Sequence, residues 1–244
     1  MTASSTDVLN FHLPAPFAPR VDPAVRQEWL PFTVSAVADA AELRDAVRVR
    51  QSAYARHLPT FAQTLGDPEP ADAEEGALVL LARSKLDGTP LGTLRIQTNR
   101  HRPLDLERSM TLPPHLAHAC LAEATRLGLA QGEGGRLVKA ALFKAFYLHC
   151  RLSGVQHMVI TGRTPIDRQY QRLLFEDVWT PNETYSMAHV SGLPHRVMHL
   201  QVQSAEARWQ AAGHPLLQFM CGIAHPDIRL PRGAQPNPPV AQVH

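Results

Sequence analysis

The chain has 244 residues, 44% of them hydrophobic, and a formal net charge of +2. This length and composition suit one domain with a sizeable core, and so small a charge gives no reason to expect general affinity for nucleic acid. No apolar run approaches the roughly 20 residues that a membrane helix needs, and the N-terminus lacks a signal-peptide core. Three widely spaced cysteines argue against a disulfide framework, so we expect a cytoplasmic protein without a membrane span.

The thirteen histidines show no spacing that predicts a metal site. The one His-x-x-x-His pair, His195 and His199, lies on an expected strand, where four residues span roughly 13 Å, too far for one zinc ion. We therefore expect no metal cofactor.

Prolines mark both ends of the chain. Residues 1–28 are expected to form a proline-rich arm and residues 230–244 a proline-rich tail. The domain is expected to span residues 29–229.

The domain begins with an expected strand and helix. Residues 31–37 have the character of a strand, and residues 38–57 that of a helix. Asp39 is the expected N-terminal cap, with Glu42 at capping-box spacing.

A loop with five carboxylates then leads to an expected hairpin. Its strands are residues 77–83 and 91–98, and Asp87-Gly88 between them is a strong turn signal.

Residues 120–150 are expected to form a strand, a glycine turn and a helix. Alternation predicts that five side chains share one face of the strand: Leu121, Glu123, Thr125, Leu127 and Leu129. The turn, residues 132–135, leads into a helix N-terminus, where unpaired N–H groups and the helix dipole suit a phosphate.

An ordinary tight connection is the alternative for this turn. The dinucleotide-binding fingerprint is not met, because Leu137 stands where its third glycine belongs, and no Gly-Lys-Ser/Thr follows as in a P-loop. If a phosphate binds here, the diphosphate of coenzyme A or the phosphopantetheine of a carrier protein remains.

The rest of the domain continues the alternation of strands and helices. A strand is expected at 155–161, and Pro165 opens a helix that runs to about Leu174. Two late strands and a final helix follow, at residues 183–190, 195–202 and 205–221.

This order of elements resembles the GNAT N-acyltransferase fold, an α/β (α+β) fold with a central mixed, mostly antiparallel sheet flanked by helices. In that family a glycine turn leads from the fourth strand into the helix that holds the cofactor diphosphate. Gln131-x-x-Gly134-x-Arg136 is similar to the family's turn pattern, and Tyr170 and Phe175 keep the spacing of an aromatic pair on its next helix.

Four ordered motifs are similar to a narrower group. They are Arg50-x-x-x-Tyr54, the pair Asp67 and Asp72, Gly92-Thr-Leu-Arg95 and Glu123-Ala-Thr-Arg126. They resemble the acyl-homoserine-lactone synthases and, still more, the long-chain N-acyl amino acid synthases. The lactone synthases usually have tryptophan after the first motif, where this chain has Thr60 and Phe61.

The resemblance implies an N-acyltransferase. Its acyl group would come from a phosphopantetheine thioester, on coenzyme A or an acyl carrier protein, and go to the amine of an amino acid or similar small molecule. Two alternatives stay open: a short-chain acetyl-CoA-dependent N-acetyltransferase, and a GNAT-like domain that binds a ligand without catalysis.

The chemistry that the resemblance implies assigns roles to residues. Glu123 is the candidate base for the amine, directly or through water, and Tyr170 is the candidate acid for the departing thiolate. The candidate cofactor-binding residues are Leu129, Ala130, Gln131, Gly132, Gly134, Gly135 and Arg136, with the N–H groups near Leu129 and Ala130 facing the thioester carbonyl. The candidate substrate-binding residues are Arg50, Tyr54, Asp67, Asp72, Arg95 and Arg126.

Each role has a structural alternative. Glu123 would instead pair with Arg126 or Arg95, and a pair with Arg126 needs a bulge because the two point to opposite faces of a regular strand. Tyr170 would instead pack on the sheet. An acidic carrier protein would also need a basic docking face, for which the candidates are Arg100, Arg102, Arg108, Arg136, Lys139, Lys144 and Arg151.

Overall fold

The computed structural model describes residues 26–132, 134–187 and 190–231. The expected proline-rich arm and tail lie almost entirely outside these residues.

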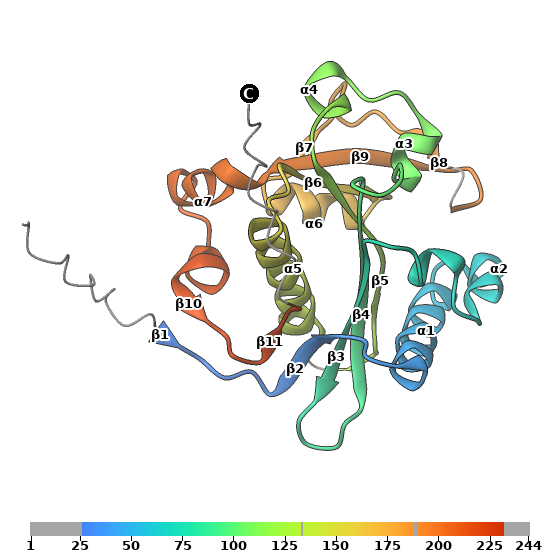
Figure 1. The fold of residues 1–244 in the computed structure, drawn as a ribbon, viewed down its shortest axis with the longest axis vertical. Coiled ribbons are helices and arrows are strands. Elements are labelled where there is room, and N and C mark those ends of the chain that lie inside the picture. The colour runs from blue at the N-terminus through green and yellow to red at the C-terminus, as the bar shows by residue number, and fades with distance from the viewer. Residues whose placement is uncertain (1–25, 133, 188–189, 232–244) are drawn as a thin grey trace, which may run out of the picture.

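A nine-stranded mixed sheet organises the described part of the chain (Figure 1). Its strand order is β11-β2-β3-β4-β5-β6-β9-β7, and β8 pairs with β9. The strands are β2 (Phe32–Ala36), β3 (Ala77–Ser84), β4 (Pro90–Thr98), β5 (Leu121–Leu129), β6 (His157–Gly162), β7 (Glu176–Asp177), β8 (Tyr185–Met187), β9 (Leu193–Gln201) and β11 (Ile228–Arg229). The pairs β11–β2 and β5–β6 are parallel and the others antiparallel, which confirms the expected sheet.

Helices cover both faces of this sheet (Figure 1). They are α1 (Ala40–Ala55), α2 (Pro59–Ala62), α3 (Asp105–Ser109), α4 (Pro114–Ala117), α5 (Gly135–Leu152), α6 (Ile166–Arg172) and α7 (Val202–Ala211). Alternate residues of β3 separate the two layers. Leu80 belongs to the core under α5, whereas Val79 and Leu81 pack with Ala46 of α1.

The start of α1 follows its sequence signal. The Asp39 carboxylate accepts hydrogen bonds from the N–H groups of Ala41 and Glu42 at 2.8 and 2.9 Å. The Glu42 side chain reaches back to the N–H of Ala38 at 2.8 Å, one residue before the cap. Two N–H groups at the start of α1, which have no acceptor within the helix, are thus bonded to a nearby side chain. Because these bonds are local, the sequence predicted where the helix begins.

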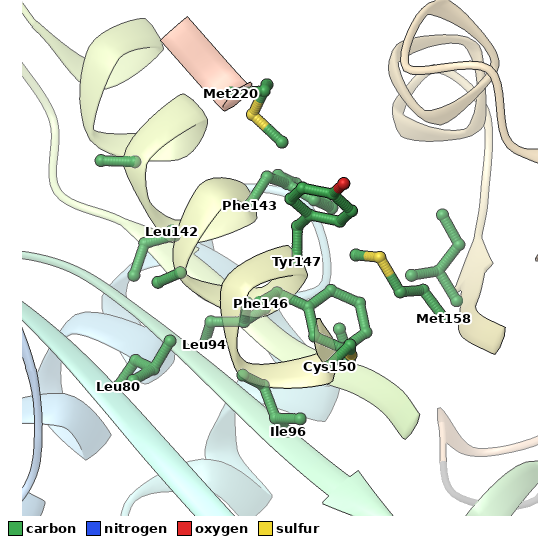
Figure 2. Packing of buried hydrophobic residues seen from close by; sticks show 14 of the residues in the cluster. Leu80, Leu94, Ile96, Leu142, Phe143, Phe146, Tyr147, Cys150, Met158 and Met220 are labelled. Atoms are coloured by element: carbon green, nitrogen blue, oxygen red, sulfur yellow. The ribbon is translucent and has the colours of Figure 1, made fainter. Parts of the chain in front are cut away.

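The main core lies between α5 and the sheet (Figure 2). Leu142, Phe146 and Cys150 of α5 are fully buried and face Leu94 and Ile96 of β4. This packing fixes α5 against the sheet, so the glycine turn at its N-terminus is held beside the end of β5.

The C-terminal part differs from the expected single helix over residues 205–221. Helix α7 ends at Ala211, because Gly213 takes a φ of +57° and Pro215, which has no N–H, follows. A short π-helix, Gln218–Gly222, then leads to β10 (Ile223–Ala224), which pairs in parallel with β1 (Arg26–Gln27). No helix in the described ranges is long and apolar enough to cross a bilayer.

Candidate active site

A cleft of about 490 Å³ opens where β5 and β6 part. The two strands pair only from Leu121–Ala124 to His157–Ile160. Beyond that point, residues 124–127 and 129 of β5 form one wall and residues 161–164 the other. Helix α1 contributes Ala53 and Tyr54, and α6 contributes Ile166, Gln169 and Tyr170.

A bulge at Arg126 divides β5 into two halves. Arg126 has a φ of +56°, and the register with β4 shifts between Thr93 and Arg95. Leu127 and Leu129 therefore pack in the α5 core together with Ala122 and Ala124. The prediction that Leu127 and Leu129 share a face with Glu123 was wrong, because a residue with positive φ interrupts the alternation.

The glycine turn adopts the conformation that its sequence suggests. Gly134 takes a φ of +91°, a left-handed conformation that favours glycine, and caps the N-terminus of α5. Apart from its chain neighbours, an added Cβ on Gly132, Gly134 or Gly135 would meet no atom of the described residues within 4 Å. No described side chain therefore covers these glycines, and Gln131 and Arg136 beside them are exposed.

Of the two N–H groups expected to face a thioester, one is already occupied. The N–H of Ala130 donates to the carbonyl of Leu91 at 2.9 Å, so that assignment was wrong for Ala130. Because successive N–H groups alternate in direction along a strand, that of Leu129 points away from β4 and toward the cleft. The Leu129 carbonyl accepts a hydrogen bond from Arg56 at 2.8 Å.

A buried charged network joins α1, β4 and β5 to the acidic loop. Arg50 is fully buried and donates to Asp72 at 2.8 and 3.0 Å and to Glu69 at 2.9 Å. Arg95 lies 3.1 Å from Glu69 and 3.2 Å from Asp72. Arg126 completes the network with two hydrogen bonds of 2.6 Å to Glu69.

Asp67 does not take part in this network, contrary to prediction. It is exposed, and Glu69 holds the place expected for it. The available signal was the spacing of Glu69 and Asp72 around Pro70, since the Asp72 carboxylate accepts from the Glu69 N–H at 2.9 Å in a short 3₁₀ turn.

The carboxylates of the network stay ionised despite their burial. Burial alone would raise the pKa of Glu69 and of Asp72. Arg126, Arg95 and Arg50 outweigh it at Glu69, and Arg50, the Glu69 N–H and Arg95 outweigh it at Asp72, so both pKa values are lowered.

The predicted substrate residues are divided by the cleft wall. Tyr54 and Arg126 line the cleft, whereas Arg50, Asp72 and Arg95 do not line it.

Glu123 is fully buried and does not line the cleft, which begins at the next residue. Its Oε2 accepts from the N–H of Leu106 at 3.2 Å, and its Oε1 has no hydrogen-bond partner. Burial, and then the charge of Asp105, raise the pKa of Glu123 to about 8. The alternative in which Glu123 pairs with Arg126 is not realised, because Arg126 bonds to Glu69.

Tyr170 stands on the cleft wall and is nearly buried. Its ring packs against Phe143 and Phe175, with centroids 5.6 and 6.3 Å away. Gly162 permits this position, because an added Cβ there would come within 2.8 Å of the ring. Burial raises the pKa of Tyr170 well above its usual value, so the hydroxyl carries a proton at neutral pH.

The seven basic residues expected to flank the glycine turn do not form one continuous surface. Lys144 is buried, and its ammonium donates to the carbonyls of Phe219 and Ile223 and contacts Nδ1 of His225. Arg151 lies in the last turn of α5, away from the glycine turn. Arg100, Arg102 and Arg108 bond instead to Ser153, Glu74 and Asp105, so of the seven expected residues Arg136 and Lys139 stand near the turn.

Other basic residues, which the sequence did not single out, line the cleft instead. They are Arg56, His57, Arg163 and His195. The sequence marks His195 only through its His-x-x-x-His spacing to His199. In the described ranges, no cluster of three or more His, Cys, Asp or Glu side chains is arranged to hold a metal ion.

Comparison with known proteins relates this arrangement to one family. The profile of the N-acyl amino acid synthases named FeeM matches residues 45–201, well over half of the chain. A search of curated protein sequences finds no match.

Two solved structures share the fold. The N-acyl amino acid synthase FeeM from uncultured soil microbes has a TM-score of 0.56 and 16% identity, covering 78% of this chain and 97% of that one. The CoA-dependent acyl-homoserine lactone synthase BjaI, solved with SAM and isopentyl-CoA, has a TM-score of 0.52 and 14% identity, covering 82% and 95%.

Proposed function

Since the chain belongs to the FeeM family of N-acyl amino acid synthases, which are acyltransferases, we propose that it transfers an acyl group from a phosphopantetheine thioester to the amine of an amino acid. The observation that carries this proposal is the cleft between β5 and β6, which opens next to the glycine turn at the start of α5.

The donor thioester enters this cleft in the proposal. The open N-terminus of α5 takes the phosphate of the pantetheine arm, because its first N–H groups and its dipole favour an anion. The exposed Arg136 and the half-buried Lys139 add positive charge there. The N–H of Leu129 faces the thioester carbonyl and stabilises the oxyanion that forms when the amine attacks.

The acceptor binds on the α1 side, near Tyr54 and Arg126. The cleft wall of the described structure contains no Asp or Glu, whereas Arg56, Arg126 and Arg163 all line it. This charge suits the carboxylate of an amino acid.

The reaction forms a C–N bond and breaks a C–S bond, and one proton must leave the nitrogen while another reaches the sulfur. Tyr170 is the proposed acid for the thiolate, because its hydroxyl is protonated and stands in the cleft. Glu123 is buried behind the wall, so it reaches the amine only through a water bound to its unpaired Oε1.

The test is to incubate the pure protein with a panel of acyl-CoA and acyl carrier protein thioesters, from two carbons upward, and a panel of amino acids. We expect amino acid-dependent thiol release and an N-acyl amino acid in the mass spectrum. Release from acetyl-CoA alone would favour the short-chain N-acetyltransferase. No consumption of any thioester would favour a domain that binds without catalysis.

A further inference from the structure

His195 stands on the cleft wall at the start of β9, and neither its sequence context nor its family assignment gives it a role. It is 8% exposed, so it is nearly buried within the protein while its side chain borders the cleft. Unlike Glu123, it therefore borders the cleft in which the acceptor is proposed to bind.

The hydrogen bonds of His195 decide which ring nitrogen carries the proton. Its Nδ1 lies 2.8 Å from the carbonyl oxygen of Leu193. A carbonyl oxygen only accepts, so Nδ1 is the donor and Nε2 of the neutral ring keeps its lone pair. Nε2 makes no hydrogen bond to any described residue. It is also absent from the set of buried polar atoms without a partner, so it is not sealed from solvent. Its lone pair is therefore accessible.

The surroundings keep this imidazole neutral. Burial lowers the pKa of His195 below 6.5, the bond to Leu193 raises it in part, and the positive charge of Arg163 lowers it further. The other ionisable groups of the cleft wall are Tyr54, Arg56, His57, Arg126, Lys139 and Tyr170. Among the described residues, no carboxylate lines the cleft to oppose these effects, so the neutral form of His195 is favoured at pH 7.

We propose that Nε2 of His195 accepts the proton that the acceptor nitrogen loses as its bond to the acyl carbon forms. This rests on the function proposed above and replaces the water-mediated route through Glu123. The amine attacks as its free base, and the nitrogen becomes cationic and strongly acidic in the tetrahedral adduct. Its proton passes to Nε2, the C–S bond breaks, and the thiolate takes a separate proton from Tyr170. The imidazolium then releases its proton to solvent, and the Tyr170 phenolate regains one from solvent.

Glu123 is the less suitable proton acceptor on two grounds. Its carboxyl is enclosed behind the wall, with one oxygen held by the Leu106 N–H. With the pKa of Glu123 at about 8, the carboxyl is mostly protonated at neutral pH and unable to accept another proton.

The test compares His195→Asn with His199→Asn. The asparagine amide can replace Nδ1 as donor to Leu193 but offers no basic nitrogen. His199 lies on the same face of β9 outside the cleft, so it controls for loss of an imidazole from this strand. We expect His195→Asn to lower kcat about 100- to 1000-fold with KM for the thioester little changed, and His199→Asn to keep kcat within about threefold.

Two readouts separate proton transfer from a structural role. The rate, divided by the concentration of free-base amine at each pH, should fall as the pH is lowered, with an inflection below pH 6.5. Because the charge of Arg163 lowers the pKa of His195, Arg163→Gln should move that inflection to higher pH. Added imidazole should restore part of the activity of His195→Ala.

Three results would overturn the inference: a His195→Asn enzyme with full activity, an inflection near pH 8 that Glu123→Gln abolishes, or no rescue by imidazole in a folded His195→Ala variant. Activity of the wild-type protein with unaffected His195 variants would leave the proposed function standing. A wild-type protein that consumes no thioester would end both proposals.

Discussion

Removing the carboxylate of Asp72 should destabilise the protein strongly. Arg50 would lose its bonds of 2.8 and 3.0 Å and keep only the 2.9 Å bond to Glu69, and Arg95 would lose its 3.2 Å contact. Both arginines are at most 1% exposed, so water cannot replace the lost partner. Breaking a buried ion pair in this way costs about 3–5 kcal/mol, so we expect Asp72→Ala to lower the free energy of unfolding by about 4 kcal/mol.

Urea unfolding followed by circular dichroism measures this difference, with Asp67→Ala as the matched control. Because Asp67 is exposed and outside the network, its replacement should change stability by at most about 0.5 kcal/mol. For a protein of this size the Asp72 variant should melt roughly 8–16 °C lower, at about 2–4 °C per kcal/mol. Equal, small effects of both substitutions would refute the assignment of Asp72 to a buried network.

The pH dependence gives this effect a direction. Burial opposes ionisation of Asp72, but the bond and charge of Arg50 outweigh it and lower its pKa from 3.8. A lowered folded-state pKa stabilises the fold above the unfolded value, and this stability is lost as pH falls through the folded value. The difference between wild type and Asp72→Ala should therefore persist at neutral pH and narrow only below about pH 3.8.

Three further substitutions test other parts of the structure. Tyr170→Phe should lower kcat for thiol release by about 10- to 100-fold while melting normally, since its ring contacts remain; an unchanged kcat would remove Tyr170 as the acid. Gly134→Ala places a side chain on a residue at φ +91°, so we expect the free energy of unfolding to fall by about 1–2 kcal/mol and the KM for the thioester to rise. An unaltered KM would argue against phosphate binding at this turn. Burial lowers the pKa of Lys144 from 10.5 to about 8, so between these two pH values the unfolded chain binds more protons and wild-type stability should rise with pH. Lys144→Met should remove this rise, measured as the urea midpoint of unfolding at each pH. An equal rise in both proteins would contradict the prediction.

The sequence predicted the parts of the site that local patterns encode. The cap of α1 depends on residues within four positions of Asp39, and the left-handed turn depends on Gly134 itself. The order of strands and helices was equally readable, because hydrophobic periodicity repeats within each element. That order, with the motifs from Arg50 to Arg126, was enough to identify the family.

The long-range network was only partly readable. Arg50, Arg95 and Arg126 stand 19, 26 and 57 positions from Glu69, so no pattern within a few residues pairs them with it. The spacing of Glu69 and Asp72 around Pro70 marks only the local turn. Which carboxylate reaches all three guanidinium groups depends on how the loop folds over the sheet. Lys144 shows the same limit, since its partners come from a segment 75 to 81 positions later.

The amino-acid sequence by itself determined the strand–turn–helix unit at residues 120–150, the capped first helix and the membership in the acyltransferase family. Tertiary structure alone decided that β5 bulges at Arg126, that Glu123 is enclosed, and that His195 borders the cleft. The physical reason is that periodicity and capping act over a few neighbouring residues. Burial and charge at the site are instead set by strands and helices that meet only after the chain has folded.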